Sequence, residues 1–352
     1  MFKRFLLLIS LFLGLYGANL QNYSTPCDEK KMTFMKVSTG SSSGTYIKIG
    51  KDLARFVAPD SCVMLQVETS RGSVDNVYKL LSSKFVALAV VQSDVLGRFK
   101  ELSRESLNPK LRNKAKKIVD RLRLVKPLYM EEVHFIVKKS SLLKKIQDIK
   151  DARINIGSNG SGTAMSSILI YKELFGDKIP HDNIFTYNYD RAFRKLMKGD
   201  IDVMVMVGGQ PISKLKSIPK RFQNKVRFLY YDKELPQQVY SYSITKIKKS
   251  SYPWMQSDIQ TIGVPSYLVT FNYGRTANKY QKKMKKALAR MAFNFKKNVH
   301  LLKRCGHKKW KEVDKNLQKP LRGWRYYNVT DFGYKYNPTT CSQRAKDLTL
   351  CR

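Results

Sequence analysis

The sequence predicts an α/β protein with two lobes, one of them inserted in the other. Apolar runs that suit buried strands alternate with amphipathic helical runs, and the continuous run at 85–96 is typical of a parallel strand covered on both faces. Two loops rich in serine and glycine each lie between a predicted strand and a predicted helix. The pattern also restarts twice, so we expect two crossings of the chain, near 127–132 and 235–245, that form a hinge.

The elements of the first half follow one another as strand, loop and helix. In chain order we expect a strand at 32–37, a helix at 47–57, a strand at 61–70, a helix at 72–83 and the buried strand at 85–96. A basic segment with helical spacing follows at 99–124. This order favours βαβ units and therefore parallel strands.

The second half repeats the pattern and then departs from it. In chain order we expect strands at 132–139 and 152–157, a helix at 164–176, and strands at 202–211 and 227–231. A long basic segment after 275 carries apolar residues at helical spacing, namely Met284, Leu288, Met291, Phe295, Val299 and Leu302. We interpret it as a helix that faces the core with a solvated basic side; a helix lying on a membrane surface is the alternative.

The chain is strongly basic. It has 352 residues, with 66 lysines and arginines against 27 acidic residues, for a formal charge of +39. Such a charge indicates binding to nucleic acid, binding to an anionic surface or partner, or a proteome that is basic throughout.

Residues 1–18 have the order of charged, apolar and small residues found in a secretory signal peptide, which we expect to be cleaved; a retained anchor is the alternative. Export argues against a chromosomal DNA-binding role, so we expect no nucleic acid partner.

Five cysteines are present: Cys27, Cys62, Cys305, Cys341 and Cys351. Export permits disulfides. Cys341 and Cys351 flank a short loop and are a plausible pair, and Cys27 with Cys62 is a second one. The odd number leaves one thiol free on any such pairing.

The two serine- and glycine-rich loops, 38–46 (STGSSSGTY) and 157–163 (GSNGSGT), share one design. Each opens a helix, whose N-terminus carries unpaired N–H groups and partial positive charge, and glycine lets the backbone approach a ligand. Such a site suits a carboxylate or a phosphate. Thr163 occupies the position of the lysine in a nucleotide-binding P-loop, so nucleotide binding is not indicated. The plain alternative is two strand-to-helix turns that bind nothing.

We expect no catalytic residues, no metal and no cofactor. No motif joins a nucleophile, a base and an orienting group, and paired acids are scarce, with Glu131 and Glu132 at the expected hinge. His300, Cys305 and His307 cluster near the end of the basic segment, and we interpret them as a surface cluster rather than a metal site.

Five blocks of sequence, in order, resemble the TAXI family, the extracytoplasmic solute receptors of one class of TRAP transporter. The blocks are STGSSSGTY with IGKDLA, SRGSVDNVYKLLSSKFVALAVVQSDV, INIGSNGSGT, VMVGGQP and TIGVPSYLVT, and the resemblance runs from about 33 to 300. It implies a type II periplasmic-binding-protein fold, with two α/β lobes joined by a two-strand hinge. It also implies a periplasmic receptor that binds glutamate, a related amino acid or a small carboxylate and hands it to a TRAP-type membrane permease. We expect a monomer.

The resemblance assigns candidate ligand-binding residues to this chain. They are Ser41, Ser42, Ser43, Thr45, Tyr46, Gln92, Ser161, Gly162, Thr163, Gly208 and Gly209. Tyr46 would pack over the ligand, or alternatively against its own lobe. The expected division is a signal peptide at 1–18, a first lobe at 33–128 plus 240–305, a second lobe at 129–239 and a basic C-terminal extension at 306–352.

Departures from the family pattern leave the ligand open. Ser41, Ser42 and Ser43 replace a usual Gly-Thr-Gly and would narrow the pocket, and the charge and the C-terminal tail are unusual. An alternative function is therefore a degenerate binding-protein fold whose basic surface binds anionic envelope polymers or lipid, or acts as a scaffold. An enzyme on the same fold, such as a transferase, is disfavoured because no base or nucleophile lies near the loops.

Overall fold

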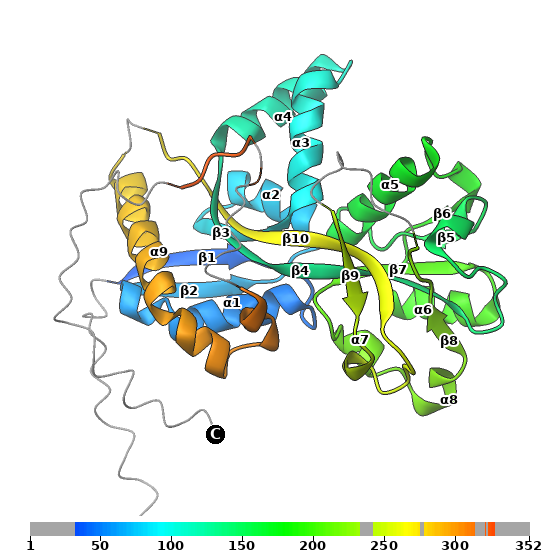
Figure 1. Ribbon diagram of the computed structural model, residues 1–352. Helices are drawn as coiled ribbons and strands as arrows, with labels where there is room; N and C mark the ends of the chain where they lie inside the picture. Colours follow the sequence, from blue (N-terminus) through cyan, green and yellow to red (C-terminus); the bar gives the residue numbers. More distant parts are fainter. Residues whose placement is uncertain (1–31, 233–241, 275–277, 314–320, 322, 328–352) are drawn as a thin grey trace, which may run out of the picture.

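The computed structural model describes residues 32–232, 242–274, 278–313, 321 and 323–327 (Figure 1). They form two α/β lobes that share one continuous sheet, in the strand order β2-β1-β3-β10-β4-β7-β5-β6, with β8 paired to β4 and β9 to β10. The expected signal peptide, 1–18, lies outside the described residues. Within the described ranges, no helix is both long enough and apolar enough to cross a membrane.

The first lobe has the βαβ order that the sequence predicted. Its strands are β1 (Thr33–Ser38), β2 (Val63–Glu68) and β3 (Val86–Gln92), and its helices are α1 (Thr45–Phe56), α2 (Ser73–Ser82), α3 (Ser93–Glu105), α4 (Pro109–Arg121) and α9 (Lys279–Cys305). β1 pairs in parallel with both β2 and β3. Every residue of β3 is buried, as predicted, but the strand ends at Gln92 and α3 begins at once with Ser93.

Apolar clusters cover both faces of this part of the sheet. On one face, α1 and α9 pack over the strands through residues such as Leu53 and Leu288. On the other, α2, α3 and α4 contribute Val77, Val95 and Ile118. The apolar stripe of α9 is buried, apart from the partly buried Val299, so the core-facing interpretation of this basic helix is confirmed.

Two long antiparallel strands connect the lobes as a two-strand hinge; the first contains the expected crossing at 127–132, and the second lies later in the chain than the expected 235–245. β4 (Leu122–Lys138) has 17 residues and β10 (Ile259–Phe271) has 13. β4 pairs with β10 up to Glu132 and with β7 beyond it. β10 pairs with β3 at one end and with β9 at the other. Figure 1 shows both strands running from one lobe into the next.

The second lobe surrounds the far half of these strands. Its other strands are β5 (Ile154–Asn155), β6 (Ile184–Phe185), β7 (Val203–Gly208), β8 (Val226–Phe228) and β9 (Ser243–Ile247), and its helices are α5 (Gly162–Phe175), α6 (Tyr189–Lys198), α7 (Ser213–Lys216) and α8 (Lys220–Gln223). The expected boundary at residue 240 differs from the packing, because Ile247 and Tyr252 join Ile136 and Phe228 in a second-lobe cluster. The sequence did not reveal that β9 would pair with the second-lobe half of β10. We propose that the return crossing lies within β10, near residue 264.

The described part of the C-terminal extension belongs to the first lobe and is not an appendage. The 3₁₀ turn η6 (Lys308–Glu312) buries Trp310 in the cluster under α9. Trp324 packs in the cluster of α2, α3 and α4, and the Tyr327 amide donates to the Leu124 carbonyl at 2.7 Å. This segment therefore completes the first-lobe core on both faces of the sheet.

Two of the five cysteines are placed in disulfides, Cys62 and Cys305. The two pairings expected from the sequence, Cys341 with Cys351 and Cys27 with Cys62, would leave Cys305 without a partner in the chain. They cannot both hold. The other three cysteines lie outside the described residues.

Candidate functional site

A cavity of about 530 Å³ lies between the two lobes, where the two serine- and glycine-rich loops face each other. Ten of the eleven residues expected from the sequence line it: Ser41, Ser42, Ser43, Thr45, Tyr46, Gln92, Ser161, Gly162, Thr163 and Gly208. Gly209 lies behind the wall, where its carbonyl accepts a hydrogen bond from Thr45 Oγ1 at 3.0 Å. Loops more than a hundred residues apart are thus brought to one site.

The N-termini of four helices reach this cavity. α1 begins after Gly44 and α2 after Gly72, and neither N-terminus is capped by a side chain. α5 and α6 also begin at the cavity, and there Ser161 and Asn188 cap the first turn. Because the N–H groups and the dipole of a helix N-terminus favour negative charge, this end of the cavity suits an anion.

The hydroxyl groups of the two loops fall into two sets. Thr163 Oγ1 accepts from the Val207 amide at 3.2 Å and Ser161 Oγ from the Ala164 amide at 3.0 Å, so both support the second-lobe wall. Among the contacts of the described residues, the hydroxyls of Ser42 and Ser43 have no hydrogen-bond partner. The same holds for Ser41 and Ser158, so four loop hydroxyls that line the cavity have no partner among the described residues and can bind a ligand.

A carboxyl group that the sequence did not identify as a site residue, Glu131, forms the floor of the cavity. The Tyr46 hydroxyl donates to Glu131 Oε2 at 2.8 Å and lies 3.3 Å from Ser73 Oγ, which in turn donates to Gln92 Oε1 at 3.2 Å. Tyr46 packs in the first-lobe core, as the alternative expected from the sequence has it, and also lines the cavity. Burial raises the pKa of Glu131 to about 8, because its charged form loses water there. The feature of the sequence that could have identified Glu131 is the pair of adjacent acids, Glu131 and Glu132, inside an otherwise apolar strand.

The lobes touch on both sides of the cavity. A Cβ atom on Gly162 would lie 1.7 Å from Gln92 Oε1 of the opposite lobe, so any side chain there would force the Gln92 side chain to move while the lobes are in contact. Lys48 Nζ donates to Ser213 Oγ across the interface at 2.8 Å. Asp94 accepts from Ser166 and Tyr242, and burial raises its pKa to about 6. These contacts hold the lobes together around the cavity.

The cavity rim carries two cations, and both are paired. Arg71 bonds Asp75 at 3.3 Å, and Lys214 bonds Asp190 at 3.1 Å. The aromatic rings of Tyr187 and Tyr189 line the second-lobe side. Sequence reasoning did not identify these residues, because neither a lone cation nor a lone tyrosine marks a site without its spatial neighbours.

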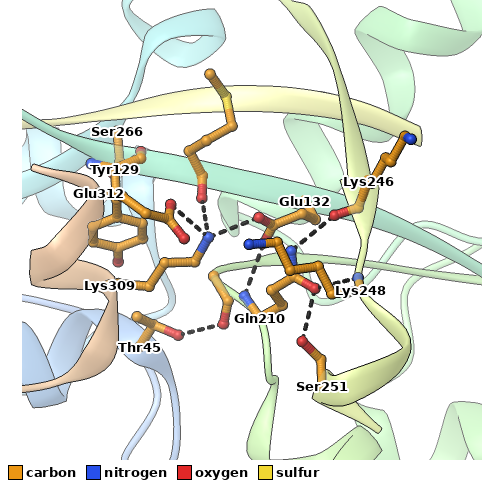
Figure 2. Close-up of polar contacts among 12 residues, drawn as sticks. Thr45, Tyr129, Glu132, Gln210, Lys246, Lys248, Ser251, Ser266, Lys309 and Glu312 are labelled. Atoms are coloured by element: carbon orange, nitrogen blue, oxygen red, sulfur yellow. Dashed lines mark hydrogen bonds and ion pairs between the residues drawn. The ribbon is translucent and has the colours of Figure 1, made fainter. Parts of the chain in front are cut away.

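Behind the cavity, a buried ion network holds the segment that follows β7 (Figure 2). Lys309 from η6 is 1% exposed, and its Nζ donates to Met130 O at 2.9 Å, Glu132 Oε1 at 2.7 Å and Glu312 Oε2 at 2.8 Å. Glu132 Oε2 accepts from the Gln210 amide at 2.8 Å. The Gln210 side chain continues to the second lobe, where Oε1 accepts from Ser251 Oγ at 2.8 Å. The network thus joins the C-terminal turn, the hinge strand and the cavity wall.

Solved structures with a related arrangement include three bacterial proteins. ArtJ of Geobacillus stearothermophilus, an arginine-, lysine- and histidine-binding protein, has 14% identity and a TM-score of 0.43, over 80% of this chain and 97% of that one. A putative periplasmic sulfonate-binding protein, SsuA of Methylobacillus flagellatus, has 12% identity and a TM-score of 0.42, over 80% and 72%. XAC2383 of Xanthomonas citri has 9% identity and a TM-score of 0.45, over 80% and 89%. At these values the similarity says nothing of what this chain binds.

The family assignment is direct. Residues 37–289, well over half of the chain, match the NMT1-like family. The two-lobed α/β fold is that of the type II periplasmic binding proteins, as the sequence predicted. The chain therefore belongs to the NMT1-like family.

Proposed function

We propose that the protein is the extracytoplasmic receptor of a TRAP-type transporter, which binds a small carboxylate or amino acid between its lobes and delivers it to a membrane permease. One observation carries the proposal most: the N-termini of α1 and α2 in the first lobe and α5 and α6 in the second meet at one cavity. The five sequence blocks shared with TAXI receptors supply the transporter class.

Binding follows from the geometry of the hinge. With the lobes apart, each lobe offers only half of the donors. Bending of β4 and β10 brings both sets onto one anion, and the ligand stabilises the closed form because only that form makes all the contacts. The permease then recognises the closed receptor.

A thermal-shift screen tests this function. The protein is melted with each of the twenty amino acids and with C3–C5 carboxylic acids. A true ligand at a hundred times its Kd stabilises the folded state by about 2.7 kcal/mol, which raises the Tm by several degrees. If no compound shifts the Tm of a well-folded sample, the proposed function is wrong.

Two glycine substitutions at the ends of α5 give a matched comparison. Gly162→Ala places a methyl group against Gln92 and should abolish the ligand-induced shift by preventing closure. Gly176→Ala has open space around it but a φ of +70°, so it should lower the Tm and leave the ligand-induced shift unchanged. Equal shifts in both variants would contradict binding between the lobes.

A second candidate, attachment to an anionic surface, is favoured by α4. This helix projects from the first lobe with α3 (Figure 1), and only Ala115 and Ile118 of its residues are buried. It carries six cations, Lys110, Arg112, Lys114, Lys116, Lys117 and Arg121, against one acid, Asp120. Cosedimentation with anionic vesicles or polymer at low and high salt tests it. Loss of binding in Lys116→Glu/Lys117→Glu but not in Lys282→Glu/Lys283→Glu would support it, and no salt-sensitive binding would dismiss it.

A further inference from the structure

Glu131 is a buried acid that faces the cavity with one oxygen unused. It lies on the hinge strand β4, is 2% exposed and lines the cavity. Tyr46 donates to Oε2 at 2.8 Å. Among the described residues, no donor contacts Oε1 and no cation forms an ion pair with Glu131. A buried carboxyl group in this state is costly unless a further partner arrives.

The surrounding charged groups do not supply that partner. The titratable groups that act on Glu131 are Tyr46 of α1, Asp94 of α3, Tyr129 and Glu132 of β4, and Lys309 of η6. Lys309 is the one cation in this set, and its Nζ is committed to Glu132, Glu312 and a carbonyl. The rim cations Arg71 and Lys214 are paired with Asp75 and Asp190.

The cavity therefore has two ends of opposite character. The helix N-termini favour negative charge, and the floor presents an acid without a cation. A simple carboxylate satisfies the first end and leaves the second unpaired. A zwitterion satisfies both.

We propose that Glu131 receives the ammonium group of the ligand, so that the receptor selects amino acids over the same acids without an amino group and releases a proton when it binds them. This inference rests on the proposed function and narrows its ligand class. The carboxylate of the ligand then lies at the N-termini of α1 and α5.

The proton release follows from the state of Glu131 before binding. Burial raises the pKa of Glu131 to about 8, so at pH 7 the empty cavity holds this group protonated. An ammonium group at hydrogen-bond distance favours the carboxylate. Glu131 then passes its proton to solvent and pairs as the anion with the ligand cation. Affinity should rise about tenfold between pH 6.5 and 7.5 and level off above pH 8.

Calorimetric titration in two buffers with different heats of ionisation, phosphate and Tris, counts the released protons. The probes are the best amino acid of the thermal-shift screen and its analogue lacking the amino group; for L-glutamate that analogue is glutarate. We expect most of a proton to be released at pH 7 with the amino acid, none with the analogue, and at least a hundredfold weaker binding of the analogue.

Two variants with the same chemical change separate Glu131 from an acid outside the cavity. Glu131→Gln should remove the proton release and the pH dependence and narrow the preference over the analogue at least tenfold. Glu105→Gln, at an exposed acid of α3 that does not line the cavity, should change none of these. Circular dichroism establishes that both variants are folded.

The outcomes distinguish this inference from the proposed function. Equal binding of the analogue, or amino acid binding without proton release in the wild type, would overturn the role of Glu131 and leave the receptor function standing. Unchanged proton release in Glu131→Gln would also overturn it. If neither amino acids nor carboxylates bind, the receptor function fails with it.

Discussion

Glu131 and Glu132 are neighbours on one strand, and their surroundings are opposite. Successive side chains of a strand point to opposite faces. Glu132 has Lys309 on one oxygen at 2.7 Å and the Gln210 amide on the other at 2.8 Å. Glu131 has the Tyr46 hydroxyl on one oxygen and faces the cavity. The comparison teaches that a buried glutamate can serve two purposes. Glu132, with both oxygens paired, anchors the hinge, whereas Glu131, with one oxygen unpaired, remains able to bind a ligand.

The largest expected effect comes from breaking the paired acid. Lys309→Met leaves Glu132 buried without its cation, and removal of one partner of a buried ion pair costs about 3–5 kcal/mol of the free energy of unfolding. Urea unfolding measures the change. Lys308→Met, which alters the exposed neighbouring lysine, should stay within about 0.5 kcal/mol.

A double variant tests whether Lys309 and Glu132 act as a pair. Glu132→Gln combined with Lys309→Met removes both charges, so the two effects should not add, and the double variant should be more stable than their sum predicts. Additive losses would mean that the two side chains do not act as a pair.

Substitution of Glu131, the acid without a cation, should stabilise the folded protein rather than destabilise it. The pKa of Glu131 rises from 4.5 to about 8 on folding, so the folded state holds a proton that the unfolded chain releases in this range. Stability therefore falls as the pH rises from 4.5 to 8. Glu131→Gln removes this loss, and the variant should gain about 4 kcal/mol over the wild type at pH 8 and only about 1 kcal/mol at pH 5. Unfolding at both pH values measures it; a constant difference would contradict a raised pKa.

The smallest effect is expected at the cavity rim. Asp190 pairs with Lys214 at 3.1 Å, but its side chain is 61% exposed. Because exposed ion pairs are screened by water and salt, Asp190→Asn should change the free energy of unfolding by less than about 0.5 kcal/mol at pH 5 and at pH 8. A change as large as that of Glu131→Gln would remove the contrast between floor and rim.

Local pattern predicted much of the cavity wall. The loops before α1 and α5 show in the sequence as serine and glycine between a strand and a helix, and Gln92 stands at the end of an apolar run. Fold class and hinge follow from the same patterns, because buried strands and amphipathic helices are encoded by neighbouring residues.

Partners distant in the sequence were not predictable. Lys309 is one of many lysines, and only the fold carries it to Glu132, 177 residues away. In the sequence, Glu131 is one of two adjacent acids at an expected hinge. That it faces the cavity depends on the loops of both lobes, which the sequence does not place. The expected lobe boundary near residue 240 differs from the packing for a similar reason, because β9 pairs with β10 and Ile247 and Tyr252 pack with residues of the second lobe.

A crystal structure of the protein grown with the best amino acid from the screen tests the central claim most directly. We predict one ligand between the lobes, with its carboxylate on the N–H groups at the starts of α1 and α5 and its ammonium nitrogen within hydrogen-bond distance of Glu131. A ligand bound in the reverse orientation, or outside the cavity, would contradict the claim.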